Sequence, residues 1–152
     1  MQESDLRPRD VLTAKDTRAR DLLAEACLRP SRQRLALTEH LFAAGGRHVS
    51  ASDLHDELVR KGAPVSLCCV YSTLRRFSEI GLIRRVPVYG ATAYFDTDTS
   101  HHHHFYVANE DRLIDLPNGA INIRNIPDVP EGYDLISIDV VLRLKSSRQP
   151  PS

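Results

Sequence analysis

Three apolar-periodic segments, each preceded by a serine, constrain the fold of this chain most strongly. Ser31, Ser50 and Ser66 each stand directly before such a segment, and Gly81 follows the last one. Serine is a preferred helix N-cap because its side-chain oxygen accepts a hydrogen bond from a free backbone N–H of the first turn. The pattern therefore predicts three helices in close succession, ending at Gly81.

The hydrophobic period changes after Gly81. Residues 82–88 and residues 92–95 read as two short strands separated by Gly90. Three helices followed by a two-stranded hairpin is the order of a winged helix-turn-helix domain, in which the third helix enters the major groove of DNA. The third helix carries an apolar stripe with helical spacing, formed by Leu67, Val70, Leu74 and Phe77.

The second half of the chain predicts a small sheet of about three strands, over residues 105–107, 113–116 and 133–144. Such a sheet covers its own apolar face poorly, so we expect the chain to form a homodimer. The expected fold class is α+β, with an N-terminal winged helix-turn-helix domain followed by a small α/β dimerisation domain. The expected divisions are an N-terminal tail and helix (1–28), a winged-helix DNA-binding domain (29–90), a dimerisation and metal-sensing domain (91–145) and a tail (146–152).

The formal net charge of zero hides an uneven distribution. Residues 1–90 hold 15 Lys and Arg against 11 Asp and Glu, whereas residues 91–152 hold 5 against 9. A basic N-terminal half favours an anionic partner, although scattered solvated charges give the same counts. The sequence has no apolar run long enough for a membrane span, no signal-peptide core and three cysteines that make no disulfide framework. We therefore expect a cytoplasmic protein with no membrane partner. Because no nucleotide-binding or nucleophile motif is present, we do not expect an enzyme.

The polar face of the third helix and the start of the first are candidates for DNA contact. Arginine, tyrosine and serine side chains bind phosphates, and arginine also binds guanine edges. An ordinary solvated helix face is the alternative reading. The candidate DNA-binding residues are Arg29, Arg32, Arg34, Tyr71, Ser72, Arg75 and Arg76.

The run of four histidines, residues 101–104, is the sharpest local signal. On a strand, His102 and His104 point to one side and His101 and His103 to the other. His102 and His104 can therefore share a metal, with acidic residues nearby in sequence, and the absence of a thiolate favours Fe, Mn or Zn. A solvent-facing strand end is one alternative, and axial ligation of haem is another.

Several segments together resemble the ferric uptake regulator (Fur) family over about residues 28–145. These are LRPSRQRLAL, RHVSASDLHDEL, VSLCCVYSTLRRFSEIGLIRR and the acid-plus-HHHH stretch. The lack of a C-x-x-C motif, the TAYFDT-to-HHHH spacing and the VPEGYDLISIDVVLRL ending are most similar to the iron response regulator (Irr) branch. The resemblance implies a homodimeric, metal- or haem-responsive DNA-binding regulator, repressor or activator, of iron homeostasis genes.

Carried over residue by residue, the resemblance implies a hinge metal site at His48, Asp96, His102, His104 and Asp115. A second metal or haem site would use His101 and His103, but the remaining metal positions of the family fall on Asn122 and Ile138, and Ile138 cannot ligate. The structural zinc cysteines of the family fall on Val107 and Glu110, so that site is absent. A zinc- or manganese-responsive regulator of the same family, or a small metal-binding protein without DNA affinity, remains an alternative.

Overall fold

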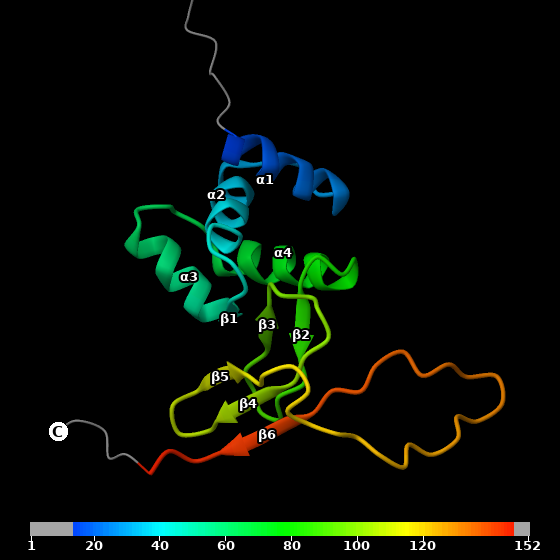
Figure 1. Ribbon diagram of the computed structural model, residues 1–152. Coiled ribbons are helices and arrows are strands. Elements are labelled where there is room, and N and C mark those ends of the chain that lie inside the picture. Colours follow the sequence, from blue (N-terminus) through cyan, green and yellow to red (C-terminus); the bar gives the residue numbers. More distant parts are fainter. Residues whose placement is uncertain (1–13, 148–152) are drawn as a thin grey trace, which may run out of the picture.

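The computed structural model describes residues 14–147, and the expected N-terminal and C-terminal tails lie mostly outside this range. The helices gather at one end of the molecule, and strands from the second half of the chain lie at the other end (Figure 1). The helices are α1 (Ala14–Glu25), α2 (Arg32–Leu41), α3 (Ala51–Arg60) and α4 (Leu67–Glu79). The strands are β1 (His48–Ser50), β2 (Arg84–Val86), β3 (Tyr94–Asp96), β4 (His104–Val107), β5 (Arg112–Asp115) and β6 (Val141–Leu144). The α+β fold class is confirmed.

The three expected caps start α2, α3 and α4. Each serine has extended backbone geometry, and its Oγ accepts a hydrogen bond from the backbone N–H three residues later. Ser50 also donates to Asp53 Oδ2 at 2.7 Å, which completes a reciprocal cap on α3. The caps thus fix where the helices begin.

The helical core lies between α1, α2, α3 and α4. The α4 stripe is buried from Val70 onward, but Leu67 is 40% exposed because it is the first residue of the helix and lies beyond the core. The largest fully buried side chains of this core are Leu23, Leu37, Leu41, Leu54, Leu58, Leu74, Phe77 and Ile83.

Two three-stranded sheets follow the helices. The first has the order β1-β3-β2 and is antiparallel throughout. The second has the order β5-β4-β6, with β6 parallel to β4. Strand β1 was not expected from the sequence. Strand β3 pairs with both β1 and β2, so residues 94–96 belong to the same sheet as these two strands.

The expected strand over residues 133–144 is wrong except at its end. Only Val141–Leu144 forms a strand. Strand β4 has four residues, and each of them pairs with one residue of this segment. The preceding residues run as the long irregular connection that extends sideways in Figure 1. Among residues 14–147, none of the helices combines the length and apolarity needed to span a lipid bilayer.

Candidate metal centre

The two sheets bring histidine and aspartate side chains together from both halves of the chain. In the first sheet, His48 on β1 lies directly opposite Asp96 on β3. In the second sheet, His104 on β4 lies directly opposite Asp115 on β5. Residues directly opposite each other on paired strands project to the same face. Because His102 and His104 are two residues apart, both rings reach the same place.

All five donor atoms of this cluster lie within 4.8 Å of one another. Asp96 Oδ2 is 3.3 Å from the Nε2 of His48, 2.8 Å from that of His102 and 3.1 Å from that of His104. Asp115 Oδ1 is 2.8, 3.2 and 3.5 Å from the same three nitrogens. The structure thus brings together the full set that the resemblance implied: His48, Asp96, His102, His104 and Asp115.

The charges of this cluster are strongly coupled. Burial alone would raise the pKa of Asp96, but the imidazoles of His104 and His48 and a hydrogen bond from the Asp98 backbone N–H hold that pKa well below its usual range. Burial alone would lower the pKa of His48, but the carboxylates of Asp96 and Asp115 raise it above its usual value. Asp96 is therefore a permanent buried carboxylate that attracts positive charge.

The Nε2 nitrogen of His102 points into the cluster. Its Nδ1 lies 2.9 Å from the carbonyl oxygen of Ser100, which only accepts, so Nδ1 carries the proton. Its Nε2 faces Asp96 Oδ2 at 2.8 Å, so without a second proton on the ring this nitrogen presents a lone pair to the carboxylate. Two acceptors this close repel each other unless a proton or a cation lies between them. A histidine that donates its other nitrogen to a carbonyl is the usual arrangement at metal sites.

Two further observations fit a divalent cation. His48 Nε2 is buried and makes no well-directed hydrogen bond, although it faces both carboxylates. Donors about 2.1 Å from one ion and at right angles to each other lie about 3.0 Å apart, which matches the separations between the nitrogens and oxygens here. Three imidazoles and two carboxylates form a mixed donor set that suits Fe, Mn or Zn.

The other candidate ligands lie outside this cluster. Asp98 turns away, and its carboxylate accepts a hydrogen bond from the Ser100 backbone N–H. His101 and His103 pack edge to face with ring centroids 5.3 Å apart. His103 Nδ1 accepts a hydrogen bond from the Val140 N–H, which occupies one lone pair and leaves the proton on Nε2. Within residues 14–147, no other group of three such donors forms.

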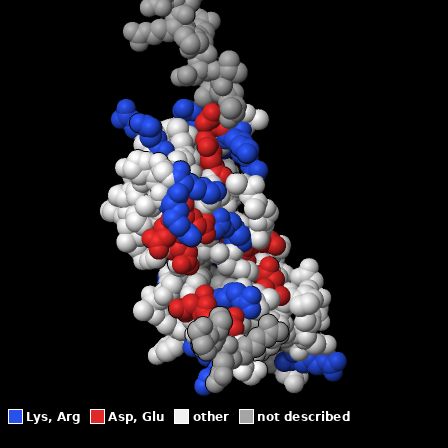
Figure 2. All heavy atoms as spheres, turned by 90° about the vertical axis from the view of Figure 1, so that its left-hand side faces the viewer, with Lys and Arg blue, Asp and Glu red and all other residues white. Residues whose placement is uncertain are grey.

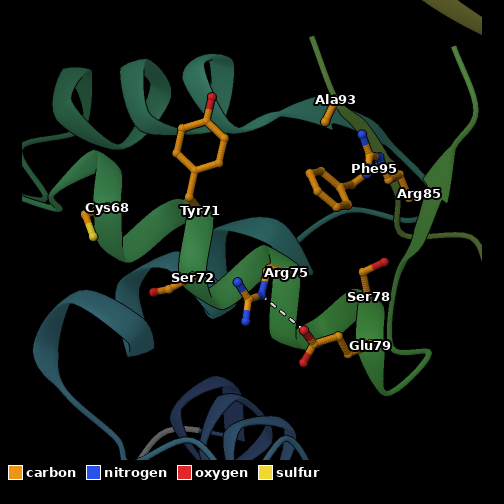
Figure 3. Close-up of a pocket in the computed structure, with 9 residues that line it drawn as sticks. All are labelled: Cys68, Tyr71, Ser72, Arg75, Ser78, Glu79, Arg85, Ala93 and Phe95. Carbon is orange, nitrogen blue, oxygen red and sulfur yellow. Dashed lines mark hydrogen bonds and ion pairs between the residues drawn. The ribbon is translucent and has the colours of Figure 1, made fainter. Parts of the chain in front are cut away.

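Three candidate DNA contacts meet at one hollow between α4 and the first sheet. Tyr71, Ser72 and Arg75 line a cavity of about 520 Å³ whose other wall comes from β2 and β3. Figure 3 shows the Tyr71 ring projecting from α4 on the same side as Phe95 and Arg85. Arg85 and Phe95 are residues of this surface that the candidate set missed. Arg85 had a sequence signal, its basic charge on a wing strand, whereas nothing in the sequence marks Phe95.

The remaining arginine candidates make other contacts. The Arg76 guanidinium donates to the Ala26 carbonyl at 2.8 Å and to Glu79, so it ties α4 to the end of α1. Arg34 donates to the carbonyl of Arg29, while Arg32 lines a separate hollow beside Pro64. On the face shown in Figure 2, basic and acidic side chains are interspersed rather than separated. The α4 cavity is therefore the better-defined candidate surface for DNA.

Comparison with known proteins gives one consistent relationship. The family model described as "Ferric uptake regulator family" matches residues 25–143. The ferric uptake regulation protein of Pseudomonas aeruginosa is 30% identical over 128 residues, covering 83% of this chain and 96% of that protein.

Solved structures agree with this relationship. The ferric uptake regulator from Pseudomonas aeruginosa with manganese has a TM-score of 0.63 at 26% identity, covering 86% of this chain and 98% of that one. The Vibrio cholerae ferric uptake regulator has a TM-score of 0.66 at 23% identity, covering 83% and 98% respectively, and so shows the shared fold.

Proposed function

Because this chain belongs to the ferric uptake regulator family, a family of metal-responsive transcription regulators, we propose that it is a homodimeric, DNA-binding regulator of iron homeostasis genes. The observation that carries this proposal is the convergence of five metal donors from both halves of the chain. His48 and Asp96 come from the sheet next to the helices, whereas His102, His104 and Asp115 belong to the second half.

The proposed role of the ion is to neutralise the two carboxylates and join the two halves. His48, His102 and His104 supply lone pairs, while Asp96 and Asp115 supply charge. Without the ion, the carboxylates of Asp96 and Asp115 depend on protons and on the imidazoles for compensation. A bound ion therefore favours one arrangement of the halves, and in a dimer that arrangement sets the distance between the two α4 helices. The ion can change DNA affinity only as far as its own affinity differs between the arrangements of the halves.

The finer assignments are also proposals. We assign the chain to the iron response regulator branch, with Fe or Mn as the physiological metal, zinc as the alternative, and a cytoplasmic location. Haem would reach the histidine run at His101, whose side chain is exposed, rather than at His103, whose Nδ1 lone pair is engaged. An absorption titration with haem tests this: His101→Ala removes the haem spectrum, and His103→Ala leaves it.

Selection of DNA tests the regulatory function. The purified chain is mixed with random-sequence duplexes in the presence of Mn(II) or of a chelator, and the bound duplexes are amplified and sequenced. We expect enrichment of a two-fold symmetric site in at least one condition, because a dimer reads two half-sites. Failure to enrich any sequence in both conditions contradicts the proposal and favours a metal-binding protein without DNA affinity.

A second measurement connects the α4 cavity to this function. Affinity for the enriched duplex should fall steeply with salt, because basic side chains release counterions from the phosphates. Tyr71→Phe should weaken DNA binding without changing the affinity for Mn(II), since Tyr71 is 51% exposed on α4 and lies outside the metal cluster. Equal loss of both properties would indicate misfolding instead.

A further inference from the structure

Arg84 on β2 has contacts that neither the proposed metal cluster nor the α4 cavity explains. It lies directly opposite Asp96 on β3, and Asp96 lies directly opposite His48 on β1. The three side chains therefore form one row on one face of the first sheet. Two members of this row are proposed ligands, whereas the third is a cation that would repel a metal ion.

The Arg84 guanidinium binds the backbone of the histidine run. One terminal nitrogen donates to the carbonyl of His102 at 2.8 Å, and the other donates to the carbonyl of Ser100 at 3.3 Å. The side chain is only 23% exposed, and its Nε is buried without a partner. The fork geometry of arginine suits two neighbouring carbonyls, whereas a lysine ammonium reaches one at a time.

The Ser100 carbonyl connects Arg84 to a proposed metal ligand. This oxygen accepts from Arg84 and also from His102 Nδ1 at 2.9 Å. The bond to Nδ1 orients the His102 ring and directs its Nε2 into the metal cluster, the usual arrangement of a histidine ligand. Arg84 therefore holds both the backbone of His102 and the acceptor that sets its ring.

We propose that Arg84 is a positioning residue of the metal centre, which anchors the histidine run of the second half to the first sheet and presets His102 for metal binding. This inference rests on the proposed metal centre. Arg84 does not contact the ion; it acts through the carbonyls of Ser100 and His102. It also approaches Asp139 at 3.9 Å, which extends the same anchor to the segment before β6.

Because Arg84 is positively charged, the direction of the change in metal affinity on its removal tests the proposal. If Arg84 acted only as a nearby positive charge, its removal would tighten metal binding. If it positions His102, its removal weakens metal binding. The expected loss for Arg84→Gln is about tenfold or more, the usual effect of removing a residue that orients a metal ligand. Arg84→Lys keeps the charge and one possible hydrogen bond, so its loss should be smaller.

Competition titrations of Mn(II) and Zn(II) against a chelating dye measure these affinities. Arg112→Gln on β5 is the matched control, because it removes the same charge from an exposed arginine outside the cluster and should leave the affinity unchanged. The decisive comparison is a double-mutant cycle. In the His102→Ala background, Arg84→Gln should cost nothing further, because the residue it positions is gone.

A spectroscopic signal distinguishes positioning from general stabilisation. In the zinc-bound wild type, nitrogen NMR of the imidazole rings should show His102 protonated at Nδ1 and bound through Nε2, and Arg84→Gln should weaken this signature. Equal or tighter metal binding by Arg84→Gln, or the same loss with and without His102, overturns the inference while the metal centre stands. If the wild-type chain binds neither metal, the proposed metal centre fails and this inference fails with it.

Discussion

At the scale of single residues, Asp96 is the centre of the account. One of its carboxylate oxygens faces three imidazole nitrogens, and the other accepts the Asp98 backbone N–H at 2.8 Å. The residue is 1% exposed, so its charge is compensated by these neighbours rather than by water. A buried carboxylate with this set of neighbours needs either protonated histidines or a metal ion.

Replacement of this carboxylate should abolish tight metal binding. We expect Asp96→Asn to weaken Mn(II) affinity by about 100-fold, at the upper end of the effect of orienting residues, because it removes both a ligand and a charge. Calorimetric titration measures the change. Asp98→Asn is the matched control, since that carboxylate lies outside the cluster and accepts a hydrogen bond from the Ser100 backbone N–H. Similar affinity in the wild type and Asp96→Asn would place the metal elsewhere.

The sequence predicted part of this site from physical reasoning alone. Strand alternation places His102 and His104 on the same side, and the structure agrees. His48 could not be predicted from its surroundings, because its position depends on pairing between β1 and β3, which are far apart in sequence. Only the family resemblance pointed to it. The role of Arg84 was not visible either, because backbone carbonyls leave no mark in a sequence.

At the scale of elements, an ion-pair group ties α3 to α2 and to the segment before β1. Glu57 on α3 binds His40 on α2 at 2.7 Å and Arg47 at 2.8 Å. Lys61 Nζ donates to the other nitrogen of the His40 ring at 3.1 Å. Burial alone would raise the pKa of Glu57, but Arg47 and His40 lower it below its ordinary value of 4.5.

The lowered pKa of Glu57 predicts how stability depends on pH. A carboxyl whose pKa is lower in the folded state stabilises the fold above its unfolded pKa, here 4.5, and loses this effect as the pH falls through the folded value. Glu57→Gln should therefore cost about 1 kcal/mol at neutral pH and progressively less below pH 4.5. Urea unfolding at several pH values measures this. The same cost in Asp56→Asn, which alters an exposed neighbour, would contradict it.

An aromatic cluster joins the two sheets away from the metal centre. Tyr94 on β3 and Tyr106 on β4 pack with ring centroids 5.9 Å apart, and Tyr106 donates to Asp111 at 2.5 Å. The Arg143 guanidinium lies 5.2 Å from the Tyr106 ring and donates to the Tyr89 carbonyl at 2.8 Å. The halves therefore share a contact that needs no ion.

Loss of the Tyr106 hydroxyl should destabilise the aromatic cluster, since it removes the bond to Asp111 within the second half. We expect Tyr106→Phe to lower the free energy of unfolding by about 1 kcal/mol, because Asp111 loses a buried partner. Thermal unfolding of the metal-free chain measures the change. Tyr89→Phe serves as the control, since that side chain is 90% exposed and only its backbone is used. Equal stability of both variants would show that the bond from Tyr106 to Asp111 does not stabilise the aromatic cluster.

The helices could be predicted from sequence more reliably than the strands. Caps and a helical period are local signals, so α2, α3 and α4 begin where the serines predict. Strand length depends on a partner: residues 133–144 alternate like a strand, yet only four of them find one. Strand β1 has three residues and therefore no detectable period.

At the scale of the whole molecule, the second sheet has two unlike faces. One face carries His104, Tyr106 and Asp115 towards the first half. On the other face, Phe105 lies opposite both Ile114 and Leu142, which are 38% and 39% exposed. Apolar side chains also remain exposed along the connection before β6. An apolar face of this kind on a small sheet favours a second copy of the chain as its cover.

A charge on this face should disrupt the dimer. We expect Leu142→Asp to weaken dimerisation by about tenfold or more, because a buried carboxylate there would lack a partner. Sedimentation velocity over a range of concentrations measures the dissociation constant. Val59→Asp on α3 is the control, because Val59 is 52% exposed and lies outside the second sheet. A monomeric wild type, or an unchanged dimer in the Leu142→Asp variant, would place the interface elsewhere.

We propose that one ion, bound by residues of both halves, controls DNA binding through His48. The most direct test is the affinity of wild type and His48→Ala for the selected duplex, by fluorescence anisotropy with and without Mn(II). Mn(II) should raise or lower the DNA affinity of the wild type by about tenfold or more. It should leave the DNA affinity of His48→Ala almost unchanged. An equal response of both proteins to Mn(II) would contradict the account.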